Sequence, residues 1–291
     1  MPELPEVESL RLTLSCTVLG KTIRAVEIRR SSLREPIACE LSTALVGQQI
    51  KALARRGKYL LLRLDKGTLV IHLGMSGSLT HRVAARGENS LACGERRSEL
   101  ATALPLDPKH DHLQLSLNDG TELVYNDPRR FGLFKFVEVE DANSLPELKV
   151  LGPEPLTDEF NQAYLAAKLR RRKAAIKNVL MDQRVVAGLG NIYASEILFH
   201  AGVRPTRKAF SLTLREIGRV VDGTKTVLAR AIDAGGTTFR NYLDSRGRPG
   251  RFASSLSVYG RAGESCPRCL GKIRCIVLGQ RSTFYCPRCQ K

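Results

Sequence analysis

The start of the chain offers a candidate nucleophile. The sequence begins Met1-Pro2-Glu3-Leu4-Pro5-Glu6, and removal of Met1 would leave Pro2 with a free secondary amine. Such an amine titrates at roughly 8, against about 10.4 for lysine, so much more of it is neutral and able to attack carbon. Glu3 could give or accept the proton that such a reaction moves. Pro2 and Glu3 therefore suit Schiff-base chemistry, although a proline and acids also suit the first turn of a helix.

Four cysteines near the C-terminus have the spacing of a zinc site. They form two Cys-Pro-Arg-Cys pairs, Cys266 with Cys269 and Cys286 with Cys289, and each pair can present two thiolates to one ion. Four cysteine ligands fill a tetrahedral zinc and leave no position for a substrate. We therefore expect one structural Zn²⁺, for which Cys275 is not needed, and no catalytic metal.

Residues near these cysteines and in a glycine-rich turn could contact a nucleic acid. Arg281 lies near the expected tip of a hairpin, available to a phosphate or a minor groove, but it could equally be a solvated surface residue. Gly188-Leu189-Gly190 leads into Asn191, the expected cap of a helix whose backbone N–H groups suit a phosphate. A plain tight turn is the alternative. Lys177 and the basic run 170–173 favour clamping of a DNA backbone.

Two further motifs place basic residues beside apolar ones. Lys58 follows Arg55-Arg56-Gly57 and precedes an apolar strand, where it could be an ordinary strand-edge lysine. In the segment 127–132, Arg129 and Phe131 are two residues apart and would point the same way in an extended chain. A cation with an aromatic wedge suits insertion into a duplex from which a base is extruded, whereas the same segment could be only a β-turn.

The whole chain is strongly basic. Its 291 residues include 46 Lys and Arg against 29 Asp and Glu, a formal net charge of +17. Such a charge favours a polyanion partner, most often nucleic acid. No apolar run is long enough to span a membrane and the N-terminus lacks a signal-peptide pattern, so we expect a cytoplasmic protein whose cysteines do not form disulfides.

The elements that position these residues predict an α+β protein. A leading helix is followed by short strands at 59–64, 68–73, 113–117, 121–125 and 131–139, which predict an N-terminal β-sandwich catalytic domain over 1–140. Prolines and glycines mark a linker over 141–156. Helices at 174–182 and 191–201, joined by a glycine turn, predict a helix–two-turn–helix domain over 157–260. A zinc-finger β-hairpin is expected over 261–291.

Other helix boundaries and loops follow from local signals. Thr157 is expected to cap a helix that runs toward Arg171, and Thr213 with Glu216 predicts a capping box for a later helix ending near residue 235. The segment 235–259 has the composition of a mobile loop. The stretch 82–108 has no periodicity and is interpreted as a long loop or insertion with no assigned function.

Taken together, these motifs resemble the formamidopyrimidine-DNA glycosylase family along essentially the whole chain and in order. The stretch 82–108 is longer than the family pattern. The resemblance rests on MPELPEVE at the start, RRGKYL over 55–60, HLGMSG over 72–77, KHDH over 109–112, DPRRFG over 127–132, LGNIYASE over 189–196, VYGR over 258–261 and the four-cysteine finger.

The resemblance implies a bifunctional DNA glycosylase and AP lyase that acts on oxidised purines such as 8-oxoguanine and formamidopyrimidines. By matching position, Pro2 would be the Schiff-base nucleophile and Glu3 its acid/base partner. Lys58 would supply the proton for β-elimination, and Arg261 would assist δ-elimination.

The resemblance also implies the residues that hold DNA. His110, Arg129 and Arg172 would contact the DNA, and Met75, Arg129 and Phe131 would fill the void left by the flipped nucleotide. The segment 235–259 would close over the flipped base. The expected partner is double-stranded DNA containing oxidised bases, bound by a monomer.

Two other functions remain open at this point. An endonuclease VIII-like relative on the same scaffold would prefer oxidised pyrimidines, although Phe131 and the Leu-Pro-Glu-Val start favour the purine type. A non-catalytic zinc-ribbon DNA-binding protein would give Pro2, Glu3 and Lys58 no special role.

Overall fold

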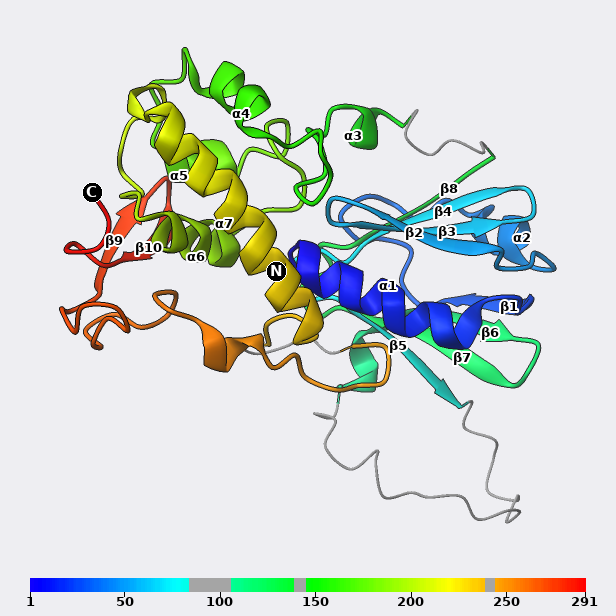
Figure 1. The fold of residues 1–291 in the computed structure, drawn as a ribbon. Coiled ribbons are helices and arrows are strands. Elements are labelled where there is room, and N and C mark those ends of the chain that lie inside the picture. Colours follow the sequence, from blue (N-terminus) through cyan, green and yellow to red (C-terminus); the bar gives the residue numbers. More distant parts are fainter. Residues whose placement is uncertain (84–105, 139–144, 239–243) are drawn as a thin grey trace. The chain divides into compact units, whose positions relative to one another are not determined.

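The computed structural model describes residues 1–83, 106–138, 145–238 and 244–291 (Figure 1). It divides into two compact units. Unit 1 comprises Met1–Ser144 and Ala234–Arg251, and unit 2 comprises Leu145–Asp233 and Phe252–Lys291. The segment 234–251 thus belongs to unit 1. Most of the stretch 82–108 and residues 239–243 of the expected loop lie outside the described residues.

Unit 1 contains two four-stranded antiparallel sheets, and the α+β class is confirmed. One sheet has the strand order β1-β6-β7-β5 and the other β2-β3-β4-β8. The strands are β1 (Ile23–Ile28), β2 (Ala52–Arg56), β3 (Tyr59–Leu64), β4 (Gly67–His72), β5 (Ser78–Val83), β6 (Asp111–Leu117), β7 (Thr121–Asn126) and β8 (Leu133–Val137), with the short helices α2 (Leu41–Leu45) and η1 (Pro108–His110) between them.

One apolar core is shared by both sheets and by the first helix, α1 (Leu4–Val18), which lies beside them in Figure 1. In β6 every second side chain is an apolar one that enters this core, as the period of a strand requires; these are Leu113, Leu115 and Leu117. Helix α1 contributes apolar residues spaced three or four apart, which share one helical face; these are Val7, Leu10, Leu14 and Val18.

The first helix begins too late for helix capping to explain Pro2. Helix α1 starts at Leu4, its N-cap is Glu3, and Pro5 lies in its first turn. Glu3 and Glu6 form a capping box, in which each side chain accepts a hydrogen bond from the other's backbone. Pro5 lies in the first turn of the helix, where the missing N–H of a proline is tolerated, whereas Pro2 precedes the helix.

Unit 2 is built from helices and one hairpin. Its elements are α3 (Pro146–Lys149), α4 (Gln162–Leu169), α5 (Ile176–Leu180), α6 (Asn191–Ala201), η3 (Ala209–Ser211), α7 (Leu214–Asp233), η4 (Phe252–Ser255), β9 (Arg274–Leu278) and β10 (Arg281–Tyr285). The predicted pair of helices around a glycine turn is α5 and α6. The predicted capping box of α7 is also present, since Thr213 N donates to Glu216 Oε2 and Glu216 N to Thr213 Oγ1.

Two predicted helix caps are wrong. Helix α4 is capped by Asn161, whose side chain accepts from Tyr164 N, and Thr157 lies upstream in a turn. The N-cap of α6 is Gly190 in an extended conformation, and Asn191 is the first helical residue. Thr and Asn both favour the N-cap position. In this structure the N-cap lies four residues after Thr157 and one residue before Asn191.

The hairpin of β9 and β10 packs against α6. Its tip is Gly279-Gln280, and both residues have positive φ, 57° and 60°, as expected for a two-residue turn between twisted strands. A small apolar cluster, formed by Phe199 of α6 with Val258, Ile273, Cys266 and Cys286, joins the finger to the helix. The finger therefore shares a core with unit 2.

Candidate functional site

The start of the chain is buried inside unit 1. Pro2 is buried, and Glu3 and Glu6 are only 3% and 1% exposed. Glu6 Oε2 accepts from Glu3 N at 2.8 Å, and Glu6 Oε1 accepts from Thr237 N at 2.7 Å. A Cβ atom at Gly236 would lie 3.0 Å from Glu6 Cγ and Oε1, which is closer than an ordinary contact. The segment before residue 239 therefore packs directly on the first turn of α1.

The surroundings of the chain start favour a neutral amine. Burial lowers the pKa of the Met1 α-amine below its ordinary value, because the charged form loses hydration. Glu3 and Glu6 raise this pKa and Lys58 and Arg129 lower it, with burial the largest effect. The Met1 amine is thus more readily neutral than an exposed α-amine, and the next residue, Pro2, is buried.

Lys58 lies close to this amine. It follows Gly57, whose φ of 56° allows the tight turn between β2 and β3, and it is only 6% exposed. The positive charge of Lys58 contributes to the lowered pKa of the Met1 α-amine. The structure therefore brings Pro2, Glu3 and Lys58 together, as an acid/base mechanism needs.

His72 borders the same region and was not assigned a role from the sequence. Its Nδ1 accepts from Gly74 N at 3.0 Å, and its ring lies 4.8 Å from that of Tyr59. Burial, reinforced by the charges of Lys58 and Arg34, lowers the pKa of His72 to about 4. His72 is therefore neutral near pH 7, and it adds no positive charge beside Lys58.

Two exposed apolar side chains lie on neighbouring loops of unit 1. Met75 is 39% exposed and Phe131 43% exposed. The guanidinium carbon of Arg129 lies 4.9 Å from the centre of the Phe131 ring. Residues 127–132 form a turn and not the start of a strand, and Arg130 has a φ of 58°. The expected cation and aromatic pair is present, but a turn and not strand alternation creates it.

His110 reaches this turn through its backbone. It ends η1, is half-buried, and its carbonyl oxygen accepts from Asp127 N at 3.0 Å. The 127–132 turn is thereby tied to the segment that precedes β6.

Unit 2 carries the other predicted DNA contacts, and one of them must be corrected. Lys177 is fully buried, and its Nζ donates to Ser282 O at 3.2 Å and to Thr283 Oγ1 at 2.7 Å. Its ammonium therefore ties α5 to β10 and cannot meet a phosphate as predicted. Arg281, one residue before Ser282, is exposed on the hairpin.

Asn191 and Arg172 also have partners within unit 2. Asn191 Nδ2 donates to Ser282 O at 3.0 Å, while its buried Oδ1 has no hydrogen-bond partner in the described part of the chain. Arg172 pairs with Asp182 at 2.9 Å and remains 37% exposed. Both side chains are held in place by the protein, and that of Arg172 stays partly exposed.

Glu196 orders the segment that leads to Arg261. Its two carboxylate oxygens accept from the backbone N–H groups of Ser257, Val258 and Tyr259 at 2.8–2.9 Å. Arg261 Nη1 donates to Ser257 O, and its Nε pairs with Glu264. No local sequence signal could identify Glu196, because its partners are some 60 residues away.

The four predicted zinc ligands converge. Their Sγ atoms all lie within 4.8 Å of one another, with Cys266 to Cys289 at 3.8 Å and Cys269 to Cys286 at 3.5 Å. A tetrahedral Zn²⁺ with bonds of about 2.3 Å requires sulfurs about 3.8 Å apart. The cluster therefore fits one structural zinc, and Cys275 lies exposed outside it.

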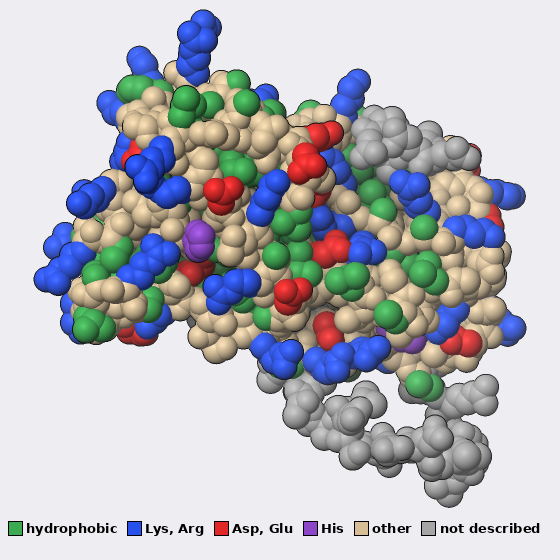
Figure 2. Space-filling model, in the orientation of Figure 1, with side chains coloured by type: hydrophobic (Ala, Val, Ile, Leu, Met, Phe, Trp, Pro, Cys, Tyr) green, Lys and Arg blue, Asp and Glu red, His purple; other side chains and the backbone are tan. Residues whose placement is uncertain are grey.

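The surface suits a polyanion. On the face drawn in Figure 2, Lys and Arg side chains are widely spread and outnumber Asp and Glu. Among the described residues, no helix is both long and apolar enough to cross a membrane.

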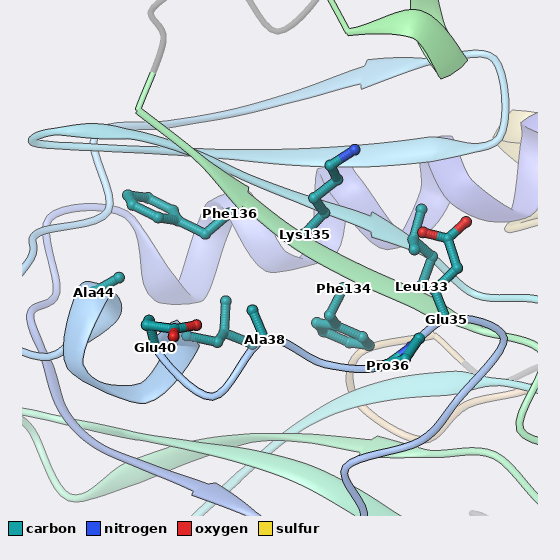
Figure 3. A pocket seen from close by; sticks show the side chains of 10 residues that line it. Glu35, Pro36, Ala38, Glu40, Ala44, Leu133, Phe134, Lys135 and Phe136 are labelled. Carbon is teal, nitrogen blue, oxygen red and sulfur yellow. The ribbon is translucent and has the colours of Figure 1, made fainter.

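A hollow of about 310 Å³ lies between β8 and the segment around α2 (Figure 3). Its lining includes Leu41, Phe134 and Phe136 with the charged side chains of Glu40 and Lys135. It contains none of the residues that the sequence predicts for the site.

Three family models match the chain in order. The formamidopyrimidine-DNA glycosylase N-terminal domain matches residues 1–134, the H2TH domain of the same family residues 151–242, and the zinc finger found in FPG and IleRS residues 263–291.

Full-length relatives carry the same name. The formamidopyrimidine-DNA glycosylase of Nitrosococcus oceani is 45% identical over 290 residues, covering 100% of both chains, and that of Hydrogenovibrio crunogenus is 46% identical, covering 100% of this chain and 97% of the relative.

Solved structures share the fold. The MutM (FPG) protein of Thermus thermophilus aligns with a TM-score of 0.81 and 37% identity, covering 99% of this chain and 98% of that chain. The Lactococcus lactis Fpg in complex with abasic-site DNA aligns with a TM-score of 0.85 and 32% identity, covering 99% of each chain. By sequence and by fold, the chain belongs to the formamidopyrimidine-DNA glycosylase family.

Proposed function

We propose that this protein is a base-excision repair glycosylase that removes oxidised purines, such as 8-oxoguanine and formamidopyrimidines, and then cuts the DNA strand as an AP lyase. The observation that carries this proposal is the buried chain start, where Pro2 and Glu3 lie in the same unit as buried Lys58. The names of the relatives support the same substrate class.

The first step is nucleophilic displacement by Pro2. After Met1 is removed, the lone pair of the Pro2 nitrogen attacks the sugar C1′, and the bond from C1′ to the base breaks. The base leaves with that electron pair and takes up a proton. The attached nitrogen then loses its proton, and the sugar ring opens at the bond between C1′ and the ring oxygen. Glu3 gives or accepts protons in these steps, and the product is an iminium ion.

The iminium ion makes the strand breakable. It acidifies the C2′ proton, and loss of that proton expels the 3′ phosphate in β-elimination; a second elimination expels the 5′ phosphate. Lys58 would move protons in the first elimination, and Arg261 would assist the second. Hydrolysis of the imine then frees Pro2.

The remaining residues bind and open the duplex. Met75, Arg129 and Phe131 would fill the void that the flipped nucleotide leaves. Arg172, Asn191 and Arg281 would contact the backbone. The zinc that the four cysteines hold would fold the finger, and no chemical step needs it. With DNA as substrate, we place the protein in the bacterial cytoplasm and expect a monomer.

Borohydride trapping tests the proposal. The protein is incubated with duplexes carrying 8-oxoguanine, an oxidised pyrimidine or no lesion, and borohydride reduces any imine to a stable adduct. We expect an adduct with the oxidised purine, mapped to Pro2 by mass spectrometry. Preference for the oxidised pyrimidine would indicate an endonuclease VIII-like enzyme. The absence of any adduct would indicate a non-catalytic DNA-binding protein.

A further inference from the structure

A single buried carboxylate organises the turn that carries Arg129 and Phe131. Asp127 is 0% exposed. Its Oδ1 accepts from Arg129 N at 3.1 Å, and its Oδ2 accepts from Phe131 N at 2.8 Å and Gly132 N at 3.1 Å. The backbone on both sides of the Phe131 side chain is therefore fixed by one acidic group.

The same carboxylate reaches the loop that carries Met75. Ser76 Oγ donates to Asp127 Oδ1 at 2.6 Å, and Tyr125 Oη donates to Asp127 Oδ2 at 2.9 Å and to Leu73 O at 3.1 Å. Asp127 and Tyr125 thus join the 73–77 loop to the 127–132 turn. Met75 lies next to Ser76, so both exposed apolar side chains depend on one buried network.

The two loops also touch where there is no room for side chains. A Cβ atom at Gly74 would lie 2.5 Å from the carbonyl carbon of Phe131, and one at Gly77 would lie 2.5 Å from Tyr125 Oη. A Cβ atom at Gly132 would overlap Tyr125 Oη. The glycines let the backbones approach until Asp127 and Tyr125 can bridge them.

We propose that Asp127 is a positioning residue that holds Met75, Arg129 and Phe131 as one rigid wedge for opening the duplex. The proposal rests on the function proposed above, for which those three residues are the wedge. Among the described residues, all partners of the Asp127 carboxylate are neutral donors. A buried carboxylate that accepts five hydrogen bonds is held firmly in place. Each lost hydrogen bond would leave part of the desolvation free energy of the carboxylate uncompensated.

Replacement by asparagine separates this role from shape. Asp127→Asn keeps the size of the side chain, but one oxygen becomes an NH₂ group. Whichever way the amide is oriented, its NH₂ group faces a backbone N–H group, either that of Arg129 or those of Phe131 and Gly132. Part of the turn is therefore released, whereas the core around it keeps its volume.

The test compares a substrate that needs a wedge with one that does not. We expect Asp127→Asn to slow single-turnover excision of 8-oxoguanine from a duplex by roughly 10- to 100-fold, the scale of a hydrogen bond to a buried charge. Strand cutting at a pre-formed abasic site in single-stranded DNA should keep its rate. The matched control is Asp65→Asn, which removes a carboxylate that accepts from Gln49 N in the same unit and should leave both rates unchanged.

A double-mutant cycle identifies the route by which Asp127 acts. If Asp127 works through the wedge, adding Asp127→Asn to Phe131→Ala should slow the duplex reaction by a smaller factor than Asp127→Asn slows it in the wild-type protein. Losses that multiply, or an equal loss on single-stranded DNA, would overturn the proposal. Should Asp127→Asn lose its unfolding transition, Ser76→Ala replaces it, and it is expected to slow only the duplex reaction.

A readout that needs no chemistry separates this proposal from the proposed function. The fluorescence of 2-aminopurine beside the lesion rises when a base pair is opened. We expect the wild-type protein to raise it and Asp127→Asn to raise it less. Opening without excision by the wild-type protein would reject the glycosylase function and retain the wedge. Normal opening by Asp127→Asn would reject the positioning role, whatever the activity.

Discussion

At the scale of single residues, Pro2 and Lys58 are both nitrogen bases, yet only one is suited to attack carbon near neutral pH. An α-amine starts with a pKa of roughly 8 and a lysine with about 10.4. Burial lowers the pKa of the amine at the chain start further. Pro2 is also not needed to start α1, because Glu3 caps that helix and Pro5 lies in its first turn.

An N-terminal extension therefore tests Pro2 directly. We predict that a protein with an uncleavable tag ahead of Met1 folds, keeps zinc and binds lesion DNA, but forms no borohydride-trapped adduct. The extension converts the amine into an amide, whose lone pair is delocalised into the peptide bond. The same protein freed to begin at Pro2 should trap and cut. A trap-competent enzyme shown by mass spectrometry to retain its tag would refute the mechanism.

His72 should make stability depend on pH. Its folded-state pKa of about 4 lies below the ordinary value of 6.5, so between these values the unfolded chain binds a proton that the folded chain does not. The free energy of unfolding should fall as the pH falls through this window, by up to about 3 kcal/mol from this residue.

His72→Asn keeps an acceptor for Gly74 N but cannot titrate. We predict that this variant loses less stability than the wild-type protein between pH 6.5 and 4, measured by urea unfolding. Equal slopes in the two proteins would show that His72 is not the group that titrates.

At the scale of elements, local sequence patterns predicted helices and strands, but they could not predict which distant residues would be in contact. Alternating leucines identified β6, and the pair Thr213 and Glu216 located the start of α7, because both signals lie within one element. The burial of Lys177 could not be predicted, since its partners lie 105 and 106 residues away in β10. Glu196 was missed for the same reason, since its backbone partners lie 61 to 63 residues away. Asp127 has local backbone partners, but its contact with Ser76, 51 residues away, depends on the fold.

Lys177 and Arg281 should differ in how they affect DNA binding. Each phosphate contact adds about 0.9 to the slope of log affinity against log salt. We predict that Arg281→Ala, at the exposed hairpin, lowers this slope by about one unit. Lys177→Met should leave the slope unchanged and lower the free energy of unfolding by roughly 1–3 kcal/mol, because it removes hydrogen bonds from a buried charge.

Salt titrations of duplex binding, with urea unfolding alongside, measure both effects. A slope that falls with Lys177→Met would show that its ammonium does reach the DNA. An unchanged slope with Arg281→Ala would make that arginine a solvated surface residue.

At the scale of the whole molecule, the net charge of +17 and the zinc finger both contribute to DNA binding in the function proposed above. Charge attracts DNA from any direction and gives no register. Register comes from folded loops and hairpins, and the hairpin has only a small apolar cluster of its own beside α6. Metal binding to the four cysteines supplies the folding free energy that so small a core lacks.

Loss of one zinc ligand should therefore remove binding and leave the chemistry of the chain start intact. We predict that Cys266→Ser and Cys289→Ser each lose zinc, unfold the finger and severely weaken binding to lesion duplex. Cys275→Ser is the matched control, because Cys275 is an exposed thiol of the same hairpin outside the cluster.

Since Pro2 and Lys58 belong to unit 1, saturating amounts of a short abasic single strand should still yield a borohydride adduct with the zinc-free variants. Metal analysis, duplex titration and trapping on the same samples give the three measurements. Full zinc content in both ligand variants would remove the cysteine assignment, and loss of trapping on the single strand would show that the finger contributes to the chemistry itself.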